Sequence, residues 1–144
     1  MCVCGGAGQE VGRGNMGLTL DVGHMLVAGE NPAQSVAMVG RAGRLFGVQL
    51  NDGHGRGEDG LMLGSVHGAM ALELVVWLVK TGYAGHIYFD TFPRNEDPVR
   101  EAEYNIRRFK ALWARAQRLL AAGVEDAMAR HDAMDSLELL ERTP

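Results

Sequence analysis

The chain has 144 residues, of which 47% are hydrophobic, and its formal net charge is −4. This length is typical of one domain, and this apolar fraction supplies a core, so global disorder is excluded. The acidic balance argues against a nucleic-acid partner, and no apolar run approaches the roughly 20 residues that span a bilayer. The two cysteines, Cys2 and Cys4, are too few for a disulfide framework or a zinc knuckle. Because no signal-peptide pattern is visible either, we expect a cytoplasmic protein.

Residues 1–16 form an irregular, glycine-rich lead-in. The stretch Gly5–Gly8 resembles a phosphate loop only weakly, because it follows no strand and lacks the Lys–Ser/Thr pair of a P-loop. Beyond it, short apolar runs alternate with helical patterns, and Asn31–Pro32 and Asp97–Pro98 are typical helix starts. The sequence predicts strands over 17–22, 45–50 and 86–89, and helices over 32–43, 65–80, 98–122, 124–130 and 136–141.

This alternation predicts an α/β fold built from parallel βαβ units, with the strands buried on both faces. Either a doubly wound sheet or a segment of a barrel fits the pattern. A complete (β/α)₈ barrel takes about 250 residues, so barrel strands here would be only three of eight. We expect residues 17–122 to form that part and residues 123–144 to form a C-terminal helical arm. A small flavodoxin-like binding domain is a third alternative, but its sheet has about five strands.

A carboxylate or carboxamide stands at the end of each predicted strand, at Asp21, Gln49, Asp52 and Asp90. The carboxyl ends of parallel strands meet on one face, where active sites are built. Oxygen ligands from three strands are typical of a site for a hard divalent cation, and His24 adds an imidazole. Taken singly, these residues also fit helix caps and turns.

The loop over 51–60 adds a second polar group. Glu58 and Asp59 could also be a pair of solvated charges in a loop that has no binding role. His67, His86 and His131 are assigned no role, and we expect Trp77 and Trp113 to pack in the core. The candidate residues in this loop are His54, Arg56, Glu58 and Asp59.

Three segments in this order resemble the xylose-isomerase-like TIM-barrel superfamily of sugar isomerases and epimerases. They are LTLDVGH, LFGVQLNDGHGRGEDGLMLGS and GHIYFDTFPRNEDPVREAEYNIRRFKALWARAQ. The resemblance is closest in motif to xylose and rhamnose isomerases and covers residues 17–119. It implies a partial TIM barrel that contains the last three strands, followed by extra helices.

The resemblance also implies a function, a divalent-metal-dependent isomerase that shifts a hydride or a proton between C1 and C2 of a sugar. An epimerase of the same superfamily is the related alternative. The implied cofactor is Mn²⁺, Mg²⁺ or Co²⁺, and His24, His54 and Arg56 would contact the sugar. Gln49 stands where the family usually has His or Asp, and its neutral amide should lower the affinity for the metal. The implied metal ligands are Asp21, His24, Gln49, Glu58, Asp59 and Asp90.

A second hypothesis is a non-catalytic fragment that needs a partner polypeptide. The acidic ligand expected one βα unit upstream is not in this chain, and no catalytic residue is assigned within it. Three βα units would leave a sheet edge and an apolar inner barrel face open. We therefore expect either a homo-oligomer or association with a missing N-terminal half. The resemblance, which extends to tetrameric relatives, also implies that the arm over 123–144 packs on a neighbouring subunit. The expected partner in solution is a small sugar, with neither nucleic acid nor membrane.

Overall fold

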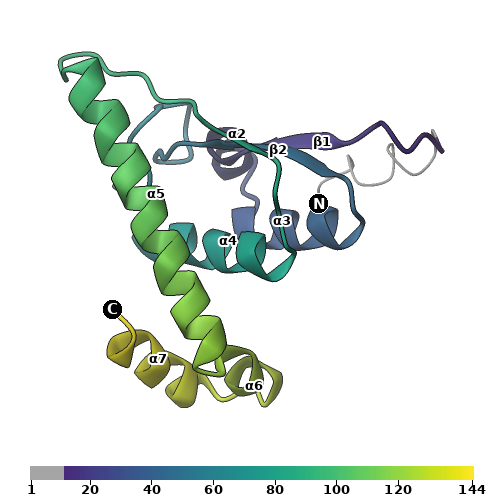
Figure 1. Ribbon diagram of the computed structural model, residues 1–144. Helices are drawn as coiled ribbons and strands as arrows, with labels where there is room; N and C mark the ends of the chain where they lie inside the picture. The colour runs from purple at the N-terminus through teal and green to yellow at the C-terminus, as the bar shows by residue number, and fades with distance from the viewer. Residues whose placement is uncertain (1–11) are drawn as a thin grey trace.

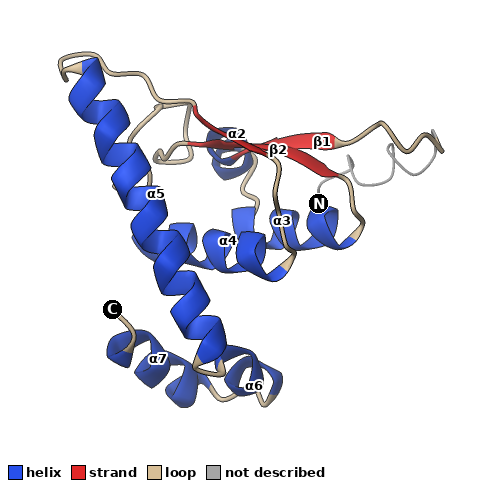
Figure 2. Cartoon of the chain, viewed as in Figure 1, coloured by secondary structure: helices blue, strands red, loops and turns tan. Residues whose placement is uncertain are grey.

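The computed structural model describes residues 12–144 and shows an α/β fold (Figures 1 and 2). Its single sheet has the order β1-β2-β3, and both neighbouring pairs are parallel. The strands are β1 (Leu18–Asp21), β2 (Leu45–Leu50) and β3 (His86–Phe89). The predicted fold class is therefore confirmed. Cys2, Cys4 and the Gly5–Gly8 stretch lie outside the described residues.

The helices pack mainly on one side of the sheet. In Figure 1, α3 and α4 lie below the strands, the long α5 runs past them, and α6 and α7 lie at the far end of α5. No helix among residues 12–144 is long and apolar enough to cross a membrane. The helices are α2 (Val22–Val27), α3 (Pro32–Arg41), α4 (Gly68–Lys80), α5 (Pro98–Ala121), α6 (Val124–Ala129) and α7 (Ala133–Arg142).

The two predicted helix starts are confirmed at the level of single hydrogen bonds. Asn31 accepts a bond from Gln34 N at 3.0 Å, and Asp97 accepts one from Arg100 N at 2.9 Å. In each case the side chain satisfies a backbone N–H of the first turn, and a proline follows the cap. These caps therefore fix where α3 and α5 begin.

Several predicted boundaries are wrong, most of them by one or two residues, such as the end of α3 at Arg41 rather than at residue 43. The first strand was predicted through Val22, but this residue starts α2, because Asp21 caps that helix by accepting a bond from His24 N. The helix predicted from residue 65 begins at Gly68. The last helix begins at Ala133 rather than at 136, because the Asp132 carboxylate accepts a bond from Asp135 N.

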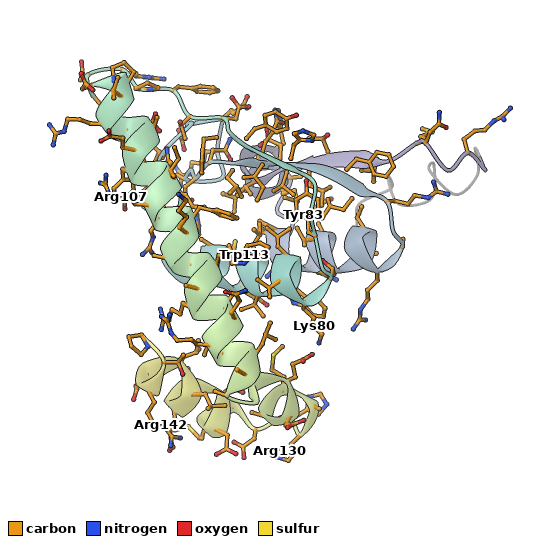
Figure 3. The ribbon with its side chains drawn as sticks, in the orientation of Figure 1. Lys80, Tyr83, Arg107, Trp113, Arg130 and Arg142 are labelled. Atoms are coloured by element: carbon orange, nitrogen blue, oxygen red, sulfur yellow. The ribbon has the colours of Figure 1, made fainter. Side chains whose placement is uncertain are left out.

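The core lies between the sheet and the helices beneath it. Leu20, Val48 and Ile87 are register partners across the sheet and share its covered face. Val48 and Leu50 are fully buried. Trp77 and Trp113 pack against this core as predicted, and Figure 3 shows Trp113 where α5 crosses α4. The largest fully buried apolar side chains are Leu50, Leu63, Leu74, Leu78, Leu119, Val36, Val48 and Val75.

The opposite face of the sheet is polar, which corrects the expectation of an apolar inner face. Asp21, Gln49 and Tyr88 are register partners, and His86 lies two residues before Tyr88 on the same face. The side chain of Gln49 is half-buried, whereas Tyr88 is 51% exposed. The strands thus alternate between an apolar face under the helices and a polar face that includes the end of β1.

Candidate metal centre

Three of the predicted ligands converge at the carboxyl end of β1. Asp21 ends that strand, His24 lies in α2, and Glu58 comes from the loop that follows β2. One potential ligand atom from each of the three lies within 4.8 Å of the others. His24 Nε2 and Glu58 Oε1 are 3.3 Å apart, and the His24 side chain is 68% exposed. The structure thus brings together side chains from two separate segments.

Asp21 is held in place by the residues that follow both strands. Its Oδ1 accepts bonds from His24 N at 3.2 Å and from Asn51 Nδ2 at 3.4 Å. Asn51 also accepts a bond from Gly23 N at 2.6 Å. Asp21 is therefore both the N-cap of α2 and a group whose orientation depends on β2.

The donor set is chemically suited to a divalent cation. Adjacent ligands of an octahedral Mg²⁺ bind at about 2.1 Å, which places them about 3 Å apart. The separation of 3.3 Å between His24 Nε2 and Glu58 Oε1 is close to this value, and one ligand atom from each of the three residues lies within 4.8 Å of the others. Two carboxylates and one imidazole suit Mn²⁺ or Co²⁺, whereas an all-oxygen set is typical of Mg²⁺.

The other predicted ligands are placed less directly. Gln49 is the register partner of Asp21, so its amide lies on the same sheet face. Asp59 binds within its own loop, where Oδ2 accepts a bond from His54 N at 2.7 Å. Asp90 continues the strand pairing by donating its N–H to Leu50 O at 3.1 Å. Asp59 and Asp90 both lie outside the three-residue group among the described residues.

The predicted substrate contacts outside that group, His54 and Arg56, lie exposed in the loop after β2. A cavity of about 600 Å³ lies between the loops after β2 and β3 and the start of α5. Its lining includes Ser65, Arg100 and Glu101, but none of the predicted ligands. This cavity and the candidate metal centre are therefore separate features of the described chain.

The sequence pattern did not indicate the structural importance of Asn51 and Asp52, the two residues that follow β2. Both are buried, with exposed fractions of 1% and 2%. Asp52 accepts hydrogen bonds from Gly53 N, Val66 N and His67 N and contacts His67 Nδ1, each at 2.8 Å. Burial alone would raise the pKa of Asp52, but the hydrogen bonds from His67, Val66 and Gly53 outweigh burial and lower the pKa.

Asp52 also explains the late start of α4. The backbone N–H groups of Val66 and His67 point at its carboxylate, and His67 as N-cap makes no capping bond with its own side chain. Asp52, which lies two residues after β2, therefore holds the backbone N–H groups of the two residues that directly precede α4. No local pattern around residue 65 could have revealed this contact.

Comparisons with known proteins agree with this architecture. A family model described as "Xylose isomerase-like TIM barrel" matches residues 7–112. A xylose isomerase of Streptomyces lividans is 34% identical over 138 residues, which cover 86% of this chain. The same alignment covers 35% of that protein, so this chain spans only that share of its relative's length.

Proposed function

Because the chain belongs to the xylose isomerase-like TIM-barrel family, we propose that it carries part of the metal centre of a sugar isomerase. The proposed reaction interconverts an aldose and a ketose by moving hydrogen between C1 and C2. The single observation that carries the proposal is the convergence of Asp21, His24 and Glu58. The xylose isomerase that resembles this chain supports a sugar as the substrate class.

Each residue has a distinct role in this proposal. Asp21 and Glu58 supply negative charge to the cation, and His24 supplies a neutral nitrogen or a contact to the sugar. A bound divalent cation supplies Lewis-acid chemistry, which polarises sugar oxygens and stabilises developing negative charge. His54 and Arg56 bind sugar hydroxyls or a phosphate from the exposed loop. Gln49, Asp59 and Asp90 are proposed as further ligands.

The residue after β3 favours one version of the reaction. Asp90 follows Phe89, and this Phe-Asp pair resembles the hydride-shift isomerases. Relatives that epimerise sugars by proton transfer tend to have a glutamate there. We therefore propose a hydride shift, with epimerisation as the alternative within the same family.

A second candidate is a subunit that acts only with another polypeptide. The observation that favours it is the three-stranded sheet, whose β1 and β3 are both edge strands in the described chain. Edge strands present unpaired backbone groups that can bind further strands. On this hypothesis the partner adds barrel strands beside β1 or β3, together with further metal ligands. The first hypothesis instead expects metal binding by a monodisperse chain alone.

Titration with Mn²⁺ in a calorimeter tests the proposal, after light scattering has established the size of the chain in solution. The variants are Asp21→Ala and, as a matched control, Glu138→Ala, which removes an exposed carboxylate on α7. We expect Asp21→Ala to weaken binding at least tenfold and the control to bind like the wild type. Asp90→Ala tests the last strand in the same way. A folded chain that binds no Mn²⁺ contradicts the metal centre, and binding that appears only in a mixed complex favours the second candidate.

A further inference from the structure

We infer that Asp52 is a positioning residue, which orders the loop over 53–60 and thereby sets the affinity of the site that contains Glu58. This inference rests on the proposed function, because it concerns the same metal centre. Asp52 does not belong to the three-residue group itself. Its effect is exerted through the backbone that carries Glu58.

The side chain of Asp52 connects two segments of the backbone. Its two carboxylate oxygens meet four nitrogen atoms, each at 2.8 Å, on Gly53, Val66 and His67. Gly53 is the first residue of the loop, whereas Val66 and His67 directly precede α4. The carboxylate therefore joins the start of the loop to the start of the next helix.

The backbone of Asp52 pairs with the residue that follows the loop. Its N–H donates to Leu61 O at 2.8 Å, and Leu61 N donates to its carbonyl at 2.9 Å. These two bonds form an isolated antiparallel bridge that brings the ends of the loop together. Inside the loop, Asp59 accepts a bond from His54 N at 2.7 Å. Glu58 directly precedes Asp59, which makes this contact inside the loop, and the bridge between Asp52 and Leu61 closes the loop.

The composition of the loop explains why such closure matters for binding. Four of its eight residues are glycines, and Gly55 and Gly60 have φ of +72° and +62°. Glycine backbones lose more conformational freedom on ordering than other residues do. If the loop is already ordered in the metal-free protein, this loss does not oppose metal binding. Asp52 therefore raises the affinity by preorganising Glu58 beside Asp21 and His24.

Asp52→Asn tests the inference, because it keeps the shape of the side chain and replaces one acceptor oxygen by a donor. Amide hydrogen exchange of the metal-free protein reports on the order of the loop over 53–60. We expect faster exchange there and, as for other residues that orient metal ligands, an affinity for Mn²⁺ about tenfold lower. His67→Ala removes only the ring contact, and we expect a smaller change in the same direction.

The matched control is Asp132→Asn, which alters a carboxylate N-cap on α7. We expect faster exchange only over 133–142 and unchanged Mn²⁺ binding. Unchanged exchange over 53–60 in Asp52→Asn overturns the inference, as does faster exchange with unchanged affinity. If Asp52→Asn does not fold, His67→Ala decides by the same two readouts. The exchange over 53–60 could differ between the wild type and Asp52→Asn although the wild type binds no Mn²⁺. That result overturns the proposed function, and with it the link between loop order and metal affinity.

Discussion

Asn51 accepts a hydrogen bond from Gly23 N at 2.6 Å, which ties the end of β2 to the first turn of α2. The same amide group donates to Asp21 Oδ1. Asn51 is 1% exposed, and both partners lie within three residues of the end of β1. The packing is close, since a Cβ atom on Gly23 would lie 2.9 Å from Asn51 Nδ2. One buried amide therefore aligns two strand ends and the proposed ligand Asp21.

Replacing this amide by a hydrocarbon of similar size should destabilise the fold. Asn51→Leu leaves the buried N–H of Gly23 without its acceptor, which typically costs about 1–3 kcal/mol. Urea unfolding at neutral pH measures the loss. Asn95→Leu is the control, because Asn95 is exposed in the loop after β3 and should change stability by less than about 0.5 kcal/mol. Equal stability of the two variants would contradict the role given to Asn51.

A second prediction concerns the contact between the loops after β2 and β3. Phe92 N donates to Gly60 O at 2.9 Å, and a Cβ atom on Gly60 would lie 2.4 Å from Phe92 Cδ2. Gly60→Ala should therefore combine the cost of a left-handed backbone, about 1–2 kcal/mol, with displacement of the ring. Gly82→Ala isolates the first effect, because Gly82 has φ of +67° and no atom within 4 Å of an added Cβ.

Urea unfolding of both glycine variants separates the two contributions. We expect Gly60→Ala to lose about 1–3 kcal/mol more than Gly82→Ala, as is typical of overpacked positions. Adding Phe92→Ala to Gly60→Ala should recover part of this difference. Equal losses in the two single variants would mean that Phe92 does not pack over Gly60.

Local patterns predicted those elements whose signals lie within their own sequence. The apolar run over 45–50 coincides with β2, and Asn31–Pro32 and Asp97–Pro98 mark the starts of α3 and α5. The two helix starts act through neighbours within four residues, and the strand signal lies in the apolar run itself, so these elements could be predicted from local sequence.

The features that were missed depend on partners far away in the chain. The start of α4 depends on Asp52, and α2 is one short helix whose cap, Asp21, was interpreted as a strand end. The polar sheet face was partly visible, since Gly47 and Gln49 alternate with Val48 and Leu50 in β2. In β3 the signal was hidden, because the amphipathic Tyr88 counts as apolar in a hydrophobic pattern.

For the candidate site, the polar residues at the strand ends and the family resemblance predicted a set of ligands, and the structure groups Asp21, His24 and Glu58. Asp59 and Asp90 stay predictions, because their positions depend on loop conformations that no local rule determines. The adjacent residues Glu58 and Asp59 illustrate how the loop conformation decides which side chain reaches the site. Asp59 binds within its loop, whereas its neighbour Glu58 lies beside His24.

Lowering the pH should remove the contribution that the ionised Asp52 carboxylate makes to the free energy of unfolding. Its pKa is lowered in the folded state by hydrogen bonds that outweigh burial. The stabilisation is therefore fully present above the unfolded pKa of about 3.9 and is lost as pH falls through the lower, folded pKa. Urea unfolding of the wild type and Asp52→Asn between neutral and acid pH should show a stability difference that shrinks in this acid range. A difference independent of pH would contradict this account of Asp52.

The C-terminal arm, residues 123–144, should depend on Arg115 of α5. The guanidinium of Arg115 donates to Leu140 O and to Thr143 O, each at 2.8 Å, at the end of α7. Arg115→Ala should therefore increase amide exchange over 133–143 while leaving the exchange of β2 unchanged. Arg142→Ala is the control, because this side chain is exposed on the outer side of the arm (Figure 3). Increased exchange of both regions would show that the arm and the sheet unfold together.

The most direct test of the metal centre is a crystal grown with Mn²⁺, in which anomalous scattering locates the ion. The account predicts an anomalous peak bound by Asp21, His24 and Glu58, with ligand distances of about 2.0–2.3 Å. The same map shows whether Gln49 or Asp90 completes the coordination. An Mn²⁺ peak at other residues only, or no peak in crystals of the folded chain at saturating Mn²⁺, would contradict the central claim.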